Sequence, residues 1–333
     1  MADAQLPKNV TRSSALDIFK GLLVFGMILA HVIQILGDRN NLLLTAISKF
    51  INLISFSGFL FAFGYANYFA YFSKDFQVVK WRMFKTGLKI FIAFYISGIA
   101  FRILFEKKAI HLLDILKIIL LADIPGYSEF LASFAIITLL ALVLFKLIKT
   151  ILSNKLYFWL LNIFLLLTTF IPYEQITINQ IGLLIGTNKF ACFPVIQYSP
   201  LYLIGIYFAR HQIKFNRMAL LISSAFTLSF ISYLLYTHKL PNRFPPSLFW
   251  IVGSALFLYI YFLASNLLAA KLKKIELLEK PGQNVLFYLL VSNIFIFAIH
   301  SIYGNMSLGV VKIFILTVAI LFVINYLQDI TRK

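Results

Sequence analysis

The chain has 333 residues, of which 61% are hydrophobic and only 13% charged, with a mean hydropathy of +0.89. In soluble domains about a quarter of all residues are charged. This composition therefore excludes an ordinary soluble protein and predicts an integral membrane protein. The net charge of +18 comes from short Lys and Arg clusters between apolar runs, a pattern that argues against nucleic-acid binding. The single cysteine, Cys192, excludes an intrachain disulfide and a cysteine-based metal site.

The apolar runs are roughly twenty residues long, the length a helix needs to cross about 30 Å of hydrocarbon. Strands of a membrane barrel would be about half as long and would alternate polar and apolar residues. We therefore predict an all-α fold with about ten transmembrane helices. The predicted spans are 16–36, 50–72, 86–105, 128–149, 156–172, 194–209, 218–236, 246–269, 284–300 and 307–327.

Both ends of the chain are predicted to lie in the cytoplasm (N-in/C-in). This orientation places most of the 30 Lys and Arg residues in cytoplasmic segments, as the positive-inside rule requires. Residues 110–122 are apolar but too short to span, and they predict an interfacial or re-entrant helix on the outer side. No internal repeat or linker divides the sequence, so residues 1–333 are expected to form one domain.

The first span contains the most informative polar residues. Asp17 and Lys20 lie three residues apart at its start, on one face of the helix. His31 follows fourteen residues after Asp17, about 21 Å along the axis, which places an imidazole inside the membrane. An ionisable residue at that depth is a functional candidate. The alternative is a neutral histidine that bonds to a neighbouring helix.

Five short segments, in order along the chain, resemble the transmembrane acyltransferase superfamily. This superfamily includes the acyltransferase-3 (O-acyltransferase) family and the heparan-α-glucosaminide N-acetyltransferase-like family. The segments are Asp17-Ile-Phe-Lys20-Gly21 with His31, Phe56-Ser-Gly-Phe-Leu60, Arg82-Met-Phe-Lys85, Pro200-Leu-Tyr-Leu-Ile-Gly205 and Arg243-Phe-Pro-Pro-Ser247.

The chain departs from the family pattern at two places. The family often has Arg at the position of Lys20, and Lys cannot make the planar two-point contact of Arg. Many members have a Tyr-Leu-Leu-His segment in this part of the chain. The corresponding segment here is Tyr288-Leu-Leu-Val-Ser292, so the expected histidine is absent. Ser292 or His300 could substitute for it, although the position of His300 favours a histidine at the outer membrane interface.

The resemblance implies an acyltransferase that moves an acyl group, expected to be acetyl, from cytoplasmic acetyl-CoA or another acyl-CoA. The acceptor would be a hydroxyl or amine of an envelope or surface glycan or glycolipid. His31 would act as general base or transient acyl carrier, since imidazole titrates near neutral pH. Glu129 would orient His31 or contact the sugar; otherwise it is an outer-loop carboxylate. No metal is expected.

The same resemblance implies that four basic residues bind the phosphates of the donor. Fixed cations bind anions more strongly in a partly dry cleft than in bulk water. The four residues are Arg12, Lys20, Arg82 and Lys85. Topology and anionic lipids alone would also place cations at these helix ends.

Two other classes of function remain open. A transporter or flippase of a lipid-linked glycan would also place polar residues in mid-membrane, although no inverted repeat is visible. A structural membrane subunit is the second. We expect a multi-pass protein of the bacterial inner membrane that contacts lipids, binds no nucleic acid and could form a homo-oligomer.

Overall fold

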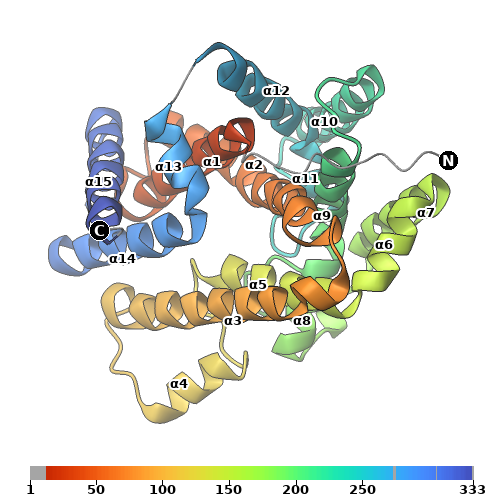
Figure 1. The fold of residues 1–333 in the computed structure, drawn as a ribbon. Coiled ribbons are helices and arrows are strands. Elements are labelled where there is room, and N and C mark those ends of the chain that lie inside the picture. Colours follow the sequence, from red (N-terminus) through yellow and green to blue (C-terminus); the bar gives the residue numbers. More distant parts are fainter. Residues whose placement is uncertain (1–12, 273–274, 305, 332–333) are drawn as a thin grey trace.

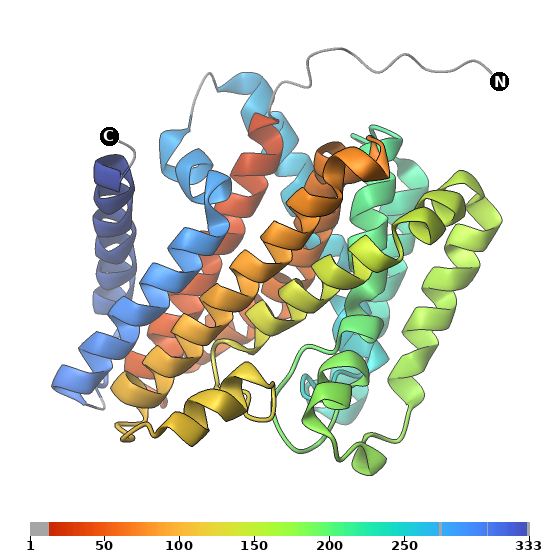
Figure 2. The same cartoon turned by 60° about the horizontal axis from the view of Figure 1, so that its bottom comes forward.

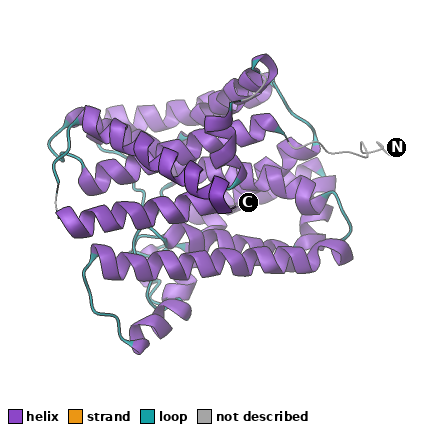
Figure 3. Ribbon diagram, turned by 60° about the vertical axis from the view of Figure 1, so that its left-hand side comes forward, coloured by secondary structure: helices purple, strands orange, loops and turns teal. Residues whose placement is uncertain are grey.

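The fold is known from a computed structural model that describes residues 13–272, 275–304 and 306–331. Within these ranges the chain is helical and forms no strand, apart from one isolated bridge between Gly37 and Leu308 (Figure 3). The all-α prediction is therefore confirmed.

Long apolar helices form most of the bundle (Figure 1). Those of 17 residues or more are α1 (Ser14–Leu36), α2 (Leu42–Asn67), α3 (Phe76–Ala100), α10 (Arg217–Thr237), α12 (Ala255–Lys271), α14 (Val285–Tyr303) and α15 (Val310–Thr331). Single π-helical turns, η1 (Tyr68–Phe72) and η2 (Phe101–Phe105), extend α2 and α3.

The remaining helices are shorter. Four of intermediate length are α5 (Glu129–Val143), α6 (Phe145–Ser153), α7 (Lys155–Leu167) and α9 (Val195–Arg210). The shortest are α4 (Leu112–Ile119), α8 (Asn179–Ile185), α11 (Leu248–Gly253), α13 (Glu276–Gln283) and the 3₁₀ turns η3 (Thr168–Phe170) and η4 (Tyr173–Gln175).

Seven helical segments of the described chain are long and apolar enough to cross a membrane, or eight if the bent pair α5–α6 is one span. This count lies below the ten predicted spans. The predicted span 128–149 is interrupted near Leu144, where α5 and α6 meet at a bend of 77°. The predicted spans 156–172 and 194–209 correspond to the short helices α7 and α9, which have 13 and 16 residues.

Side-chain caps explain where several helices begin. Ser13 accepts a hydrogen bond from the Leu16 backbone at the start of α1, and Asn41 accepts one from Leu44 at the start of α2. Asn154 and Asn216 cap α7 and α10 in the same way. The starts of α1, α7 and α10 lie within two residues of the predicted spans, whereas α2 begins eight residues before its predicted span.

Large apolar side chains cover the outward faces of the peripheral helices. Examples that lie exposed are Trp81, Phe164, Leu221, Ile315 and Phe322. A soluble monomer rarely exposes so extensive an apolar surface, whereas a lipid bilayer covers it. The described fold therefore supports a multi-pass membrane protein.

Contacts between distant segments define two ends of the bundle. At the proximal end, where α1 begins, Ser14 donates to Glu279 of α13 and Lys280 pairs with Asp329 of α15. At the distal end, where α1 ends, the Asp38 backbone N–H donates to the Leu308 carbonyl just before α15. In Figure 2 the start of α1 and the end of α15 lie at the same end, and α4 lies at the opposite one.

The segment predicted as an interfacial or re-entrant helix is helical over Leu112–Ile119. It lies at the distal end and exposes most of its residues (Figure 2). Asn179 at the start of α8 donates to the Ala122 carbonyl at 2.6 Å, which ties α8 to the segment that follows α4. The short helix is thus confirmed, and its relation to the membrane remains a prediction.

Candidate functional site

His31 lies in the last two turns of α1 and is half buried. Its Nδ1 atom is 2.8 Å from Oδ1 of Asn293 on α14. The Asn293 amide Nδ2 donates to the backbone carbonyl of Tyr127 at 3.1 Å. The Tyr127 ring and the imidazole pack in a T-shaped arrangement, with the ring centroids 5.1 Å apart.

This chain of contacts fixes the tautomer of His31. Because Asn293 donates through Nδ2 to Tyr127, its oxygen must face the histidine, and that oxygen can only accept. His31 Nδ1 therefore carries the proton, and Nε2 keeps its lone pair. No hydrogen bond to Nε2 is formed by any residue that the structure describes. A base with one nitrogen anchored and the other available suits proton transfer.

His31 lines a cavity of about 260 Å³, which we call the histidine cavity. Its polar lining comes from α1, α2, the start of α5 and the loop before α11. The polar residues at the wall include His31, Gln34, Asn52, Tyr127, Glu129 and Arg243.

Glu129 is the first residue of α5 and is buried. One of its carboxylate oxygens, Oε2, has no hydrogen-bond partner within the described residues. The orienting contact to the imidazole that was considered for Glu129 is instead made by Asn293. Glu129 therefore shares the cavity with His31, and its unpaired oxygen is available to a ligand.

Arg243 enters the histidine cavity from the loop between α10 and α11. Its guanidinium lies over the rings of Phe244 and Phe193, at 4.5 and 5.4 Å from the centroids. Burial lowers the pKa of Arg243 from its ordinary value, while the nearby Glu129 charge acts in the opposite direction. The sequence named Arg243 only as part of a short motif between the predicted spans 218–236 and 246–269.

Tyr127 adopts a left-handed backbone conformation, with φ of +58°, directly before α5. A bulky residue rarely occupies this region, and such positions are often found at functional sites. Burial, with a further contribution from the Glu129 charge, raises the pKa of Tyr127 to about 12. The phenol therefore remains protonated at neutral pH.

A second cavity, of about 210 Å³ and mainly apolar lining, lies closer to the proximal end; we call it the lysine cavity. Lys20 lies at its wall with Gly282 and Gln283, and Lys20 pairs with Asp17 at 2.9 Å. Phe59 and Phe130 line both this cavity and the histidine cavity. The two cavities therefore adjoin across these two aromatic side chains.

A close helix crossing holds the lysine cavity together. A Cβ atom on Gly21 would lie 1.9 Å from the Leu278 carbonyl oxygen, and one on Gly282 would lie 1.8 Å from the Asp17 carbonyl oxygen. The backbones of α1 and α13 thus touch through reciprocal glycines, as small residues permit in membrane helices. The Asp17-x-x-Lys20-Gly21 segment owes its glycine to this contact.

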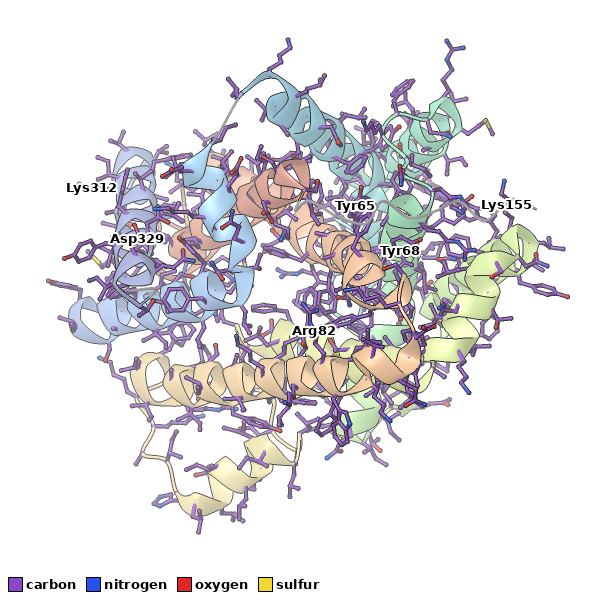
Figure 4. All side chains as sticks on the ribbon, viewed as in Figure 1. Tyr65, Tyr68, Arg82, Lys155, Lys312 and Asp329 are labelled. Atoms are coloured by element: carbon purple, nitrogen blue, oxygen red, sulfur yellow. The ribbon has the colours of Figure 1, made fainter. Side chains whose placement is uncertain are left out.

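The predicted donor-binding residues do not all line one cavity. Arg82 and Lys85 are exposed on α3 and border an open groove, where Arg82 also lies 5.8 Å from the centroid of the Tyr71 ring (Figure 4). Lys20 belongs to the lysine cavity instead. Arg12 lies outside the described residues.

Neither residue considered as a substitute for the missing family histidine contacts His31. The Ser292 hydroxyl donates to the Leu289 carbonyl of its own helix. The His300 ring stacks on Phe105 with centroids 4.5 Å apart. Asn293, one residue beyond Ser292, makes the contact, and the available signal in the sequence is a polar side chain within the predicted span 284–300. Within the described ranges, no group of three or more His, Cys, Asp or Glu side chains is arranged to hold a metal.

No protein-family model, no curated protein and no solved structure matches this chain. The resemblance to membrane acyltransferases therefore depends on the short motifs alone.

Proposed function

We propose that this protein is a membrane-embedded acyltransferase in which His31 is the general base. The observation that carries the proposal is the orientation of His31. Asn293 accepts the Nδ1 proton, so Nε2 keeps the basic lone pair, and the His31 side chain lines a cavity. A histidine that only joined two helices would need no cavity beside it.

The proposed reaction transfers an acyl group from a thioester to an acceptor hydroxyl. His31 Nε2 takes the hydroxyl proton while the oxygen attacks the thioester carbonyl carbon, and a C–O bond forms. The tetrahedral intermediate collapses with cleavage of the C–S bond. The imidazolium then returns the proton to the leaving sulfur, so that an ester and a free thiol result and His31 is regenerated. An amine acceptor would react in the same way to give an amide.

The donor would reach His31 through the lysine cavity. Lys20 lies eleven residues before His31 on α1, or roughly 16 Å along the helix. The pantetheine arm of acyl-CoA is an extended, largely uncharged chain, which suits a narrow and mostly apolar cavity. Movement of Phe59 and Phe130 would join the two cavities and admit the thioester to the histidine cavity.

The phosphates of the donor would remain at the proximal surface. Arg82, Lys85 and the neighbouring Lys89 border the same open groove on α3. Lys20 would contact the arm at the wall of its cavity, and Arg12 would add a further cation. The acceptor would enter at the distal end, where Glu129 lines the cavity and could accept a hydrogen bond from a sugar hydroxyl.

We further propose the ten-span, N-in/C-in topology in the bacterial inner membrane. Three spans beyond the seven long ones would be the bent pair α5–α6, the segment Lys155–Phe170 and α9. Contacts at the two ends of the bundle support antiparallel passage of successive helices. Lys149 in the middle of α6 donates to the Lys74 carbonyl before α3, and Tyr173 after α7 donates to the Pro246 carbonyl before α11.

A transporter is the second candidate, because two adjoining cavities in series also suit passage of a small molecule. The two functions differ in the fate of the donor. An acyltransferase cleaves the thioester, whereas a transporter leaves it intact.

The test uses the purified full-length protein with radiolabelled acetyl-CoA, and mass spectrometry of envelope glycans from cells with and without it. A glycan mass increase of one acetyl unit supports the enzyme. We expect His31→Gln to retain normal membrane levels and donor binding and to lose about 10²–10⁴-fold in transfer, since Gln cannot cycle a proton near neutral pH. Transfer within about threefold of wild type would return His31 to a packing role.

A further inference from the structure

A third cavity, of about 320 Å³, opens at the distal end and leads to the histidine cavity; we call it the mouth. Gln34, Asn52 and Arg243 line both the mouth and the histidine cavity. The two are therefore continuous at these residues. Gln34 is held in place there by donating to Ser48 and Asn52 at 3.1 and 3.2 Å.

The mouth is strongly basic. Its charged residues are Arg39, Lys49 and Arg243 against the single carboxylate of Asp38. Arg39 and Lys49 are exposed, and no ion pair with either is formed within the described residues. With Glu129 of the histidine cavity included, the path from the distal surface to His31 carries three cations and two carboxylates, so positive charge is in excess.

Arg243 stands at the inner end of this path without a polar partner. Its buried Nε has no hydrogen-bond partner, and no carboxylate of the described residues lies within ion-pair distance of the guanidinium. Aromatic rings contact it from Phe244 and Phe193 and leave the donor edge unused. Glu129 lines the same cavity and acts on Arg243 electrostatically, but it forms no ion pair with it. A guanidinium whose Nε is buried without a hydrogen-bond partner is costly, so its position at a cavity wall indicates an anionic occupant.

Topology gives no reason for these cations. In the proposed orientation the distal end faces outward, where the positive-inside rule disfavours Lys and Arg. Three cations at that end, beside one cavity, therefore require a different explanation. Electrostatic attraction of an anionic substrate provides one.

We propose that the acceptor is an acidic glycan, and that Arg243 binds its carboxylate or phosphate while Arg39 and Lys49 attract it to the mouth. This inference rests on the proposed function and adds the substrate class. Arginine presents a planar fork that matches both anions, and a two-point contact at the inner end would place a sugar hydroxyl of the same residue toward His31.

The test compares three small probes with the full-length protein: methyl β-D-glucuronide, methyl β-D-glucoside and glucose 6-phosphate. The first two differ in one carboxylate, and the third presents a phosphate. Binding is measured as the shift in the thermal unfolding midpoint with probe concentration, because a ligand of the folded state stabilises it. Acetyl transfer from acetyl-CoA to each probe is measured in parallel.

We expect at least one anionic probe to bind roughly 10- to 100-fold more tightly than the glucoside, the effect of a charged, two-point contact. Arg243→Gln should abolish this preference. Should that variant fold poorly, the double variant Arg39→Gln/Lys49→Gln changes only exposed residues and should reduce the preference several-fold, with a weaker effect at high salt. Lys312→Gln is the matched control, because Lys312 is exposed at the start of α15 near the same end and lines none of the three cavities (Figure 4).

The outcomes separate this inference from the proposed function. If all three probes bind equally well and accept acetyl groups equally well, the acidic-acceptor inference is overturned, whereas the proposed acyltransferase function stands. Selective, Arg243-dependent binding without any transfer would support the anion site and count against the acyltransferase. Absence of both anion-selective binding and transfer would count against both. A preference for only one anionic probe identifies the carboxylate or the phosphate as the recognised group.

Discussion

At the scale of single residues, the site depends on one hydrogen-bonded series that runs from Tyr127 through Asn293 to His31. Each residue in this series orients the side chain of the next one. The Tyr127 carbonyl sets the direction of the Asn293 amide, and the amide sets the tautomer of the imidazole. Asn293 is a positioning residue in this account, because it does not face the reacting atoms itself.

Replacing Asn293 with Ala should lower kcat by roughly 10- to 100-fold while donor KM changes little. The variant leaves the buried imidazole N–H without an acceptor, at a cost of about 1–3 kcal/mol, and frees the ring to adopt the wrong tautomer. Steady-state kinetics with acetyl-CoA separates the two parameters.

The control for this change is Asn266→Ala. Asn266 also lies within a membrane helix and is partly buried, but among the described residues its amide donates only to the Phe262 carbonyl of its own helix. A loss of equal size in both variants would show that removal of any membrane amide has this effect, and would contradict the positioning role of Asn293.

The exposed cations of α3 make a different prediction, for the donor. Replacing both Arg82 and Lys85 with Gln should weaken binding of CoA by about 2–4 kcal/mol, at about 1–2 kcal/mol for each charged hydrogen bond to phosphate. Equilibrium binding of labelled CoA measures this change. Lys214→Gln, an exposed cation between α9 and α10 outside this groove, should leave CoA affinity unaltered. Unchanged affinity in the double variant would assign Arg82 and Lys85 to topology alone.

At the scale of elements, glycines determine which helices surround His31. Gly21 and Gly282 bring α1 against α13, and Gly64 and Gly205 bring α2 against α9. A Cβ atom on Gly64 would lie 1.9 Å from the Tyr202 carbonyl oxygen, and Asn67 reinforces this crossing with a hydrogen bond to the Tyr202 hydroxyl. These contacts fix α1 and α2, which supply much of the wall of the histidine cavity.

Gly21→Ala should destabilise the protein by about 1–3 kcal/mol or more, because the new methyl group meets the backbone of α13 and not a flexible side chain. Gly26→Ala on the same helix is the matched comparison. Its Cβ atom would meet only the Ile51 side chain at 3.4 Å, and alanine favours a helix over glycine by about 1 kcal/mol.

Thermal unfolding in detergent should therefore place Gly21→Ala well below wild type and Gly26→Ala at or slightly above it. If both variants unfold at the wild-type temperature, α1 and α13 are not in close contact in the membrane.

At the scale of the whole molecule, the proposed function depends on the number and direction of membrane crossings, because the donor and the acceptor must enter from opposite sides of the membrane. Reporters inserted after Asp75, Lys149 and Lys214 should report the cytoplasm, and reporters near Lys107, Glu174 and Asn242 should report the outer side. Cysteine labelling of the same positions with a membrane-impermeant reagent gives an independent measurement, with the buried Cys192 replaced by Ser. Two reversed positions would contradict the ten-span topology.

The sequence alone determined that the protein is an all-α, multi-pass membrane protein, and it located the seven long helical segments approximately. Apolar runs of about twenty residues have few alternatives in lipid, since the backbone must satisfy its own hydrogen bonds there. The sequence also singled out His31, because an ionisable side chain at mid-helix depth is costly without a role. It located the starts of α2 and α3 and the end of α5 poorly, because hydropathy does not register a cap such as Asn41, a basic N-terminal part such as that of α3, or a bend near Leu144.

Only the tertiary structure decided which side chains meet. Asn293 is 262 residues from His31, and neither its type nor its spacing indicates that partnership. The separation of Lys20 from Arg82 and Lys85, and the position of Arg243 between two cavities, depend in the same way on how helices cross. Helix periodicity is a local property that the chain itself specifies, whereas a cavity forms from the packing of segments far apart in sequence.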